Sequence, residues 1–257
     1  MLSKIDRSGR YAEAYERGDR DPELVYQYIK ALNQAGKSSL KITNDYLRDQ
    51  QELAAEANLR IIFEGMTEAD SRVFELFTQY RDQLIALHSA DAYREKLLEA
   101  CRTTVDKAIE FEYRDLVDDA VDKVKKYYPA AAERFELEAE MEFAMALNDA
   151  KTYAKYARKY GKKIADGDPV KLNELAQELA INFEEDKTAM KQAEALAKEA
   201  TRHSDAYGHF LTYANILARN GKREEALDVA RRSLELAKAE GEQAVKLVER
   251  FLKKLNG

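Results

Sequence analysis

Three histidines, His88, His203 and His209, are the side chains of this chain best suited to binding a metal ion. A zinc site on a helix typically places two histidines four residues apart on one face. None of the three has a histidine partner at that spacing. His203 and His209 flank a predicted turn between helices, where a capping role at the surface is the simpler interpretation. We therefore predict no metal site.

Cys101 is the only cysteine, so it is the only candidate thiol nucleophile, and no disulfide bond can form within the chain. It shares one helical stripe with Tyr93, Leu97 and Val105. Such a stripe predicts that the thiol is a small buried apolar group, which favours a packing role over catalysis.

Carboxylates are abundant, but the cluster Asp118, Asp119 and Asp122 is typical of a solvated helix face rather than of an acid–base pair. Neither a phosphate-binding loop nor a dinucleotide fingerprint is present. A helical hydrolase or lyase inside an α-barrel remains an alternative, and it would need two buried acids with raised pKa facing one cavity. Nothing in the spacing requires this, so we predict a non-catalytic protein without a cofactor.

Composition limits the classes of partner. Charged residues form 35% of the 257 residues, and the formal net charge of -6 argues against a general affinity for nucleic acid or anionic membranes. No apolar run approaches the length of a membrane-spanning helix. Residues 1–10 carry charge without an apolar stretch, so they do not resemble a signal peptide. A cytoplasmic protein and an excised domain both fit this start.

The elements that carry these residues are predicted to be helices, because a 3.6-residue apolar period runs through nearly the whole chain. Asp21-Pro22 and Asp168-Pro169 each place Asp at an N-cap and Pro at the first helical position. We expect about fourteen helices: 11–17, 21–35, 38–49, 51–64, 68–88, 90–112, 114–127, 129–147, 149–164, 169–183, 186–201, 205–219, 223–239 and 242–255.

The sequence pattern of one helix pair occurs twice near the C-terminus. Self-similarity at such a period is the signature of helical repeat arrays, which bind other proteins more often than they catalyse reactions. Residues of the first copy recur 38 positions later in the first helix and 37 positions later in the second. The matches are Leu175, Ala176 and Leu179 with Tyr213, Ala214 and Leu217, and Ala189, Met190, Ala193 and Ala200 with Ala226, Leu227, Ala230 and Ala237.

The segment 207–237 resembles a tetratricopeptide repeat. Small residues at Ala214 and Ala226 let two antiparallel helices approach closely, and Gly221 stands at the turn between them. The pair 171–200 is a second match, and the pairs 137–161 and 23–49 are weaker ones. A single repeat cannot bury its own apolar face, so several must stack. The last helix, with an apolar stripe from Val245 to Leu255, fits a cap.

Two stretches, ERGDRDPELVYQYIKALNQAGKS and DAYGHFLTYANILARNGKREEALDVARRSLELAKAEG, resemble the helical C-terminal region of thioredoxin-family proteins from Bacteroidetes. In that family a thioredoxin-like domain precedes a helical repeat region, and the protein is typically exported. The chain itself has no Cys-x-x-Cys. The resemblance therefore implies an accessory or docking domain of a periplasmic thiol-disulfide protein, with the redox chemistry elsewhere; a cytoplasmic adaptor is the alternative.

In tetratricopeptide arrays the first helix of each pair lines a concave groove. Polar side chains there can clamp a peptide backbone or pair with a carboxylate, although ordinary solvated positions would look the same. Tyr153, Tyr156 and Tyr160 are further candidates, either as exposed binding residues or as core residues. The predicted partner-binding residues on first helices are Tyr26, Lys30, Asn33, Asn173, Gln177, Asn215 and Arg219.

These observations predict an all-α fold of antiparallel helix pairs stacked in a right-handed, tetratricopeptide-like superhelix. We expect a helical repeat-like region at 1–128 and clearer repeats with a capping helix at 129–257. The predicted function is protein–protein interaction or scaffolding, with a protein or peptide in the concave groove and no particular oligomeric state implied.

Overall fold

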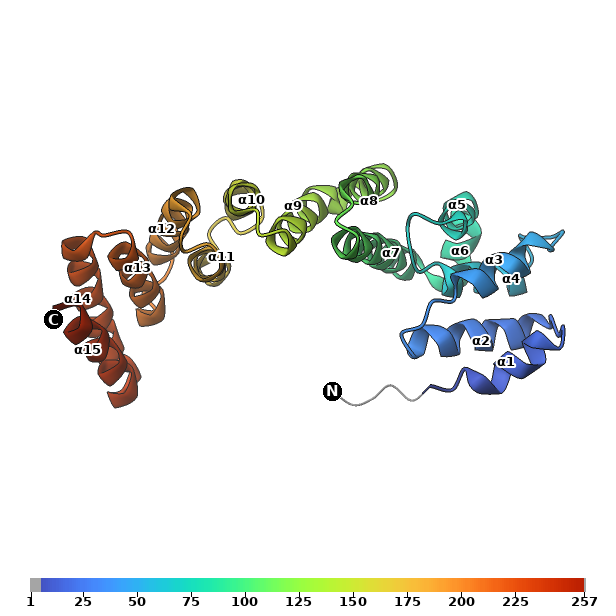
Figure 1. Cartoon of the computed structure of the whole chain (residues 1–257), viewed down its shortest axis with the longest axis horizontal. Helices are drawn as coiled ribbons and strands as arrows, with labels where there is room; N and C mark the ends of the chain where they lie inside the picture. The colour runs from blue at the N-terminus through green and yellow to red at the C-terminus, as the bar shows by residue number, and fades with distance from the viewer. Residues whose placement is uncertain (1–5, 257) are drawn as a thin grey trace. The chain divides into compact units, whose positions relative to one another are not determined.

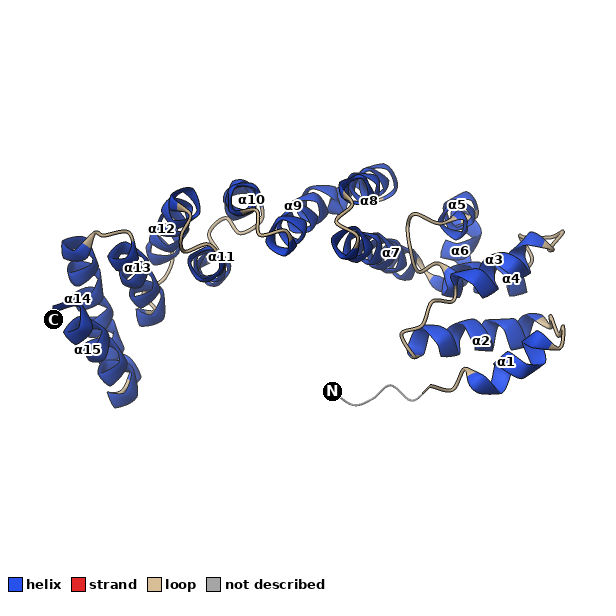
Figure 2. Cartoon of the chain, in the orientation of Figure 1, coloured by secondary structure: helices blue, strands red, loops and turns tan. Residues whose placement is uncertain are grey.

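The computed structural model describes residues 6–256, so the first half of the stretch tested for a signal peptide lies outside it. Within this range the chain forms α-helices joined by loops, without a strand (Figures 1 and 2). The predicted all-α class is confirmed. The helices are α1 Gly9–Glu16, α2 Pro22–Gln34, α3 Leu40–Arg48, α4 Glu56–Gly65, α5 Arg72–Gln79, α6 Arg81–His88, α7 Ala90–Glu110, α8 Arg114–Tyr127, α9 Pro129–Ala146, α10 Ala150–Lys163, α11 Pro169–Asn182, α12 Lys187–Arg202, α13 Tyr207–Arg219, α14 Arg223–Glu240 and α15 Glu242–Asn256.

The chain divides into two compact units. Unit 1 is Met1–Phe135 and unit 2 is Glu136–Gly257, so the division falls within α9. The predicted change of region, between residues 128 and 129, lies at the start of that helix.

The Asp-Pro helix starts are confirmed. The Oδ1 atoms of Asp21 and Asp168 each accept hydrogen bonds from two backbone N–H groups of the first turn, at 3.0 and 3.1 Å. Pro22 and Pro169 follow at the first helical position. These caps satisfy donors that have no partner inside the helix, which fixes where α2 and α11 begin.

One predicted helix, 68–88, is wrong, because the chain there forms two short helices. Tyr80 leaves the helical conformation, with φ -96° and ψ 26°, and separates α5 from α6. The break lets α5 contact α3 and α4 while α6 contacts α4 and α7. In the same region Phe77 of α5 stacks on Tyr93 of α7, with ring centroids 4.3 Å apart. No glycine or proline marks this break, so tertiary packing decides it.

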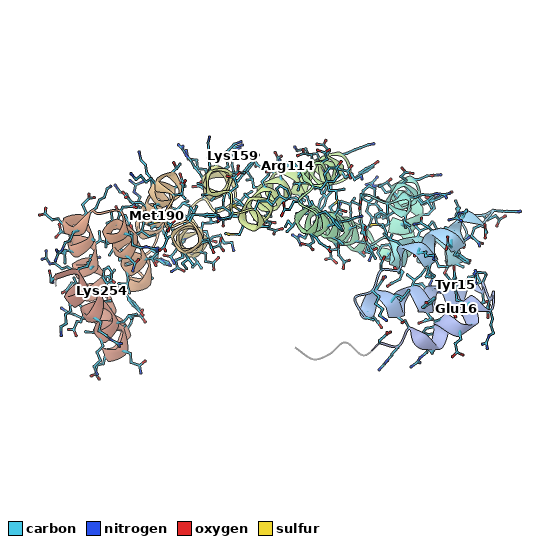
Figure 3. The ribbon with its side chains drawn as sticks, in the orientation of Figure 1. Tyr15, Glu16, Arg114, Lys159, Met190 and Lys254 are labelled. Carbon is cyan, nitrogen blue, oxygen red and sulfur yellow. The ribbon has the colours of Figure 1, made fainter. Side chains whose placement is uncertain are left out.

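Unit 2 contains two layers of helices. α10 contacts α12 in one layer, and α11 contacts α13 in the other, while α11 and α13 also pack against their following helices α12 and α14 (Figure 1). Most residues matched by the repeat are buried alike: Ala176 and Ala214 are both fully buried, and so are Leu179 and Leu217. Met190, labelled in Figure 3, belongs to the core between the layers.

Candidate functional site

A groove lies between α11 and α13 in unit 2, and we call it the α11–α13 groove. Its volume is about 490 Å³. Both helices are first helices of the matched pairs, and α15 contributes one residue. The groove is lined by Gln177, Ala180, Ile181, Tyr207, Gly208, Leu211, Thr212, Asn215, Ile216, Arg219 and Leu247.

The repeat register accounts for this lining. Gln177 and Ile181 are one turn apart on α11, and their equivalents 38 residues later are Asn215 and Arg219 on α13. Side chains four residues apart share one helix face, so each helix presents two of them to the groove. The structure therefore brings together three predicted residues, Gln177, Asn215 and Arg219. Ile181 was missed, although the same register points to it.

Apolar side chains in the α11–α13 groove are unusually open to solvent. Ile181 is 70% exposed and Leu247 is 45% exposed, whereas large apolar side chains in this unit are otherwise mostly buried. Leu211 and Tyr207 are half-buried beside them. Covering such side chains with a partner removes apolar surface from water, which is the main favourable term in association.

The polar side chains of the groove differ in whether they already form a hydrogen bond or an ion pair. Gln177 Nε2 donates a hydrogen bond to Thr212 Oγ1 at 3.0 Å, which joins α11 to α13. The Arg219 guanidinium forms an exposed ion pair with the Glu184 carboxylate. Within residues 6–256, the Asn215 amide forms no hydrogen bond. Asn215 is thus the side chain most open to a peptide backbone.

Asn173, the fourth predicted residue of unit 2, does not line this groove. It is half-buried, and its Oδ1 atom is buried without a hydrogen-bond partner among the described residues.

Two of the three predicted residues of unit 1, Asn33 and Tyr26, contact α4 instead. Asn33 Nδ2 donates to the backbone oxygen of Glu64 at 2.8 Å, and Asn33 Oδ1 accepts from Ser39 Oγ at 2.7 Å. The Arg60 guanidinium lies 4.3 Å from the centre of the Tyr26 ring, and Lys30 Nζ lies 5.8 Å from it. The Asn33 amide therefore connects helices, and Tyr26 and Lys30 belong to a cation–π group.

A second groove of about 520 Å³ lies between α9 and α11 and is acidic. Sequence reasoning missed its four carboxylates. Beneath it, Tyr153 and Tyr160 of α10 are buried, so the interpretation of these tyrosines as core residues is the correct one. Their hydroxyl groups donate to carboxylates of the groove, Tyr153 to Glu178 and Tyr160 to Glu138. The carboxylates are Glu138, Glu142, Glu174 and Glu178.

Cys101, His88 and His209 are at least partly buried, whereas His203 lies at the surface. Cys101 is fully buried, as predicted, and burial raises the pKa of its thiol to about 12. His88 stacks on Phe63 at 3.8 Å, and burial lowers its pKa and that of His209. His203 pairs with Glu199 at 3.2 Å. Across residues 6–256 there is no cluster of three potential ligands for a metal ion.

The alternative prediction, a hydrolase or lyase inside an α-barrel, requires two buried acids with raised pKa in one cavity. Where the pKa of a described carboxyl group is displaced, at Asp6, Asp149, Glu194 and Glu199, it is lowered. At Glu194, burial alone would raise the pKa, but hydrogen bonds from Lys222 and Asn220 outweigh it. These carboxylates are stabilised in their charged form, which is the opposite of the requirement.

None of the described helices is both long and apolar enough to cross a bilayer, as predicted. A scan of protein-family models found no match to the chain, and a search of curated proteins also found no match. The resemblance to helical regions of exported thioredoxin-family proteins, and the periplasmic location it implies, stay predictions.

Proposed function

We propose that this chain is a non-catalytic protein-interaction domain that binds a peptide or protein segment in the α11–α13 groove. Its C-terminal helix pairs stack, in this proposal, as a right-handed, tetratricopeptide-like superhelix. The observation that carries the proposal is the gathering of two exposed apolar side chains, Ile181 and Leu247, with the amide of Asn215 and the guanidinium of Arg219 in one groove.

The chemistry of the groove suits a peptide. Ile181 and Leu247 offer apolar surface to a partner's side chain, and interfaces typically concentrate binding energy in such anchors. The Asn215 amide carries both a donor and an acceptor, so it can pair with the N–H and C=O groups of an extended backbone. Arg219 can exchange its solvent-exposed Glu184 partner for a carboxylate of the ligand.

The stacked arrangement is supported by the repeat itself. Most matched residues are buried alike, and the matched helices α11 and α13 contact each other. Gln177 on α11 reaches Thr212 on α13 by a hydrogen bond, which ties neighbouring pairs along the groove. In repeat arrays each pair contacts mainly its neighbours, and loops stay short.

Peptide selection on the full chain tests the proposal. Peptides enriched from a displayed random library would be labelled, and their dissociation constants measured by fluorescence anisotropy. We expect the double variant Asn215→Ala/Arg219→Ala to weaken binding at least about fivefold, since each lost polar contact contributes roughly 0.5–1.5 kcal/mol. Ile181→Glu should do the same by placing a charge in the groove.

The matched control is Gln243→Ala/Arg250→Ala, which removes one amide and one guanidinium from exposed positions on α15 outside the groove. It should leave affinity within about twofold. Peptides that bind the groove variants and the wild-type chain equally would exclude the α11–α13 groove as their site.

A further inference from the structure

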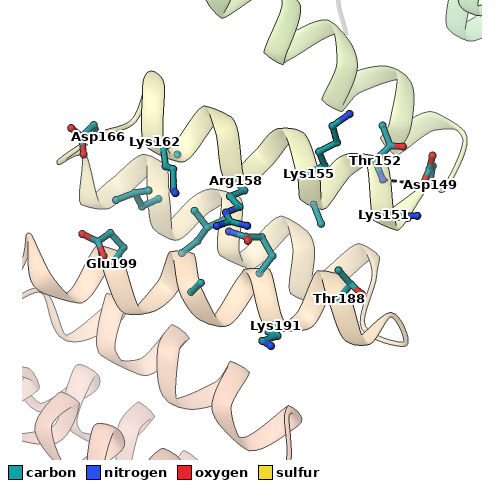
Figure 4. Close-up of a pocket in the computed structure, with 16 residues that line it drawn as sticks. Asp149, Lys151, Thr152, Lys155, Arg158, Lys162, Asp166, Thr188, Lys191 and Glu199 are labelled. Carbon is teal, nitrogen blue, oxygen red and sulfur yellow. Dashed lines mark hydrogen bonds between the residues drawn. The ribbon is translucent and has the colours of Figure 1, made fainter.

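The other layer of unit 2 carries a larger cleft between α10 and α12, which we call the α10–α12 cleft. Its volume is about 1260 Å³. Figure 4 shows Arg158 lying between the two helices, with Asp166 and Glu199 toward one end and Asp149 at the other. The groove of the proposed function is formed by α11 and α13, so the two surfaces share no lining residue.

Positive charge is concentrated in this cleft. The helix α10 carries six Lys or Arg residues and no acidic residue, in a chain whose net charge is -6. Four of these cations line the cleft at a spacing that puts them on one side of α10, and α12 adds a fifth from the facing wall. The five are Lys151, Lys155, Arg158, Lys162 and Lys191, all of them exposed.

These cations have no acidic partner in the structure. Within residues 6–256, none of the five forms an ion pair, although many exposed Lys and Arg residues elsewhere do, for example Lys222 with Glu194 at 2.7 Å. Unpaired like charges on neighbouring turns repel one another. A partner that brings negative charge removes this repulsion, so the arrangement favours an acidic ligand.

Two of the three acidic residues that line the cleft already interact with residues near them in the sequence. Asp149 caps α10 by accepting from Thr152 N at 3.0 Å, and hydrogen bonds from Thr152 lower its pKa. Glu199 pairs with Arg202 at 2.7 Å and with His203 at 3.2 Å. These acids therefore offset little of the positive charge at the centre of the cleft.

The bottom of the cleft is apolar, which distinguishes a protein ligand from a nucleic acid. Leu172 and Leu196 line it beside Gly161, and a methyl group at Gly161 would lie 2.8 Å from Leu196 Cδ2. A phosphate backbone has no apolar face with which to cover this bottom. A helix with apolar residues on one face and acids on its flanks fits both features.

We propose that the α10–α12 cleft is a second docking surface, and that its occupant is an acidic amphipathic helix of a partner protein. The α10 wall has 14 residues, which corresponds to about 21 Å, or four turns of a bound helix. The apolar face of that helix packs on exposed Ala195 and on the aliphatic stems of the wall lysines, above the buried Leu172 and Leu196. Its acids pair with Arg158 and the lysines of the walls.

The test uses the full chain and two fluorescein-labelled peptides of about 16 residues. One has Leu on one face and Glu on the other, and the second has Gln in place of every Glu. We expect saturable binding of the Glu peptide, at least about tenfold tighter than the Gln peptide and weaker as salt increases. Equal binding of the two peptides would overturn the proposal.

Two charge-reversal variants locate the site. Arg158→Glu/Lys191→Glu alters both walls of the cleft, and we expect it to weaken the Glu peptide at least about tenfold. The control Lys159→Glu/Lys198→Glu makes the same charge change on the same two helices at exposed positions outside the cleft. Lys159 is labelled on α10 in Figure 3. An equal loss in both variants would mean that only overall charge matters, against the proposal.

Three further outcomes are decisive. Tighter binding of a single-stranded oligothymidine of equal charge, lost in Arg158→Glu/Lys191→Glu, would assign the cleft to nucleic acid instead. Self-association in sedimentation velocity that only this variant abolishes would assign it to a second copy of the chain. We expect the variant Asn215→Ala/Arg219→Ala to bind the Glu peptide as tightly as the wild-type chain does, since the α11–α13 groove is separate from the cleft. If this variant lost binding, the peptide would be assigned to the α11–α13 groove instead.

Discussion

The hydroxyl group of Tyr153 on α10 donates a hydrogen bond to the carboxylate of Glu178 on α11. This contact joins the two helix layers of unit 2 at the bottom of the groove between α9 and α11. Burial of Tyr153 and the negative charge of its acceptor both raise the pKa of the phenol, so the neutral donor is strongly favoured.

Tyr153→Phe should destabilise unit 2 by about 1 kcal/mol, because one hydrogen bond is lost while exposed Glu178 regains water. Urea unfolding followed by circular dichroism measures the change. Tyr207→Phe is the control, since the Tyr207 hydroxyl forms no hydrogen bond within residues 6–256. An effect of Tyr153→Phe no larger than the control would show that the contact adds no net stability.

Stability should fall steeply at alkaline pH. Burial raises the pKa of several tyrosines above the ordinary value of about 10, to about 12 at Tyr93. A group with a raised folded-state pKa contributes stability that is complete below the unfolded pKa and is lost as pH rises through the folded pKa. Melting temperatures should therefore show little change from these groups between pH 7 and 9, and drop above about pH 10. The buried tyrosines shifted in this way are Tyr15, Tyr46, Tyr93, Tyr153 and Tyr213.

Tyr93→Phe separates this cause from general alkaline damage. The variant cannot ionise at position 93, so its stability should decline less between pH 10 and 12 than that of the wild-type chain. Parallel curves for the two proteins would rule out ionisation of Tyr93 as a contributor.

Gly65→Ala should destabilise unit 1 by about 1–3 kcal/mol, although alanine normally favours a helix. An added methyl group would lie 2.4 Å from the Thr43 side chain and 3.0 Å from Thr43 Cβ, where α3 and α4 approach closely. Thr43→Ala in the same chain should recover part of the loss by removing the nearer atoms. The thermal unfolding of the two variants measures both effects.

Gly208→Ala is the matched control for this clash, because nothing lies within 4 Å of the added group. It should be neutral or stabilising by up to about 1 kcal/mol. A destabilisation of similar size at both glycines would contradict the steric explanation.

Asn33→Ala should act on stability and not on binding. The substitution leaves the buried Ser39 hydroxyl and the Glu64 carbonyl without their partner, with an expected loss of about 1–3 kcal/mol. Faster hydrogen exchange confined to α2–α4 would localise it. Gln34→Ala, at the exposed neighbouring position, should change little. Weaker binding of groove-selected peptides by Asn33→Ala would show that Asn33 has a role beyond packing.

The fold class could be predicted because helical period, Asp-Pro caps and repeat register all agree. The register also makes Gln177 and Asn215 equivalent positions of the two repeats, and it predicted part of the groove. Asn33 carries the same amide group as Asn215, and only the tertiary structure shows that this amide already forms hydrogen bonds with Glu64 and Ser39. The break at Tyr80 could not be predicted either, because tertiary packing and no local sequence signal determines it. The basic character of α10 was visible in the sequence, whereas its lack of acidic partners was not.

Unit 2 gathers charges of opposite sign at two surfaces. The carboxylates Glu138, Glu142, Glu174 and Glu178 outnumber the one cation, Lys171, in the groove between α9 and α11, and the cations of α10 line the α10–α12 cleft. Such a distribution gives the unit an electric dipole moment that its net charge does not describe. The chain should therefore adsorb to a cation-exchange resin at low salt through one face, despite being an anion overall. Any charged surface it meets in solution would orient it before contact, so that the acidic groove and the basic cleft present themselves to partners of opposite sign.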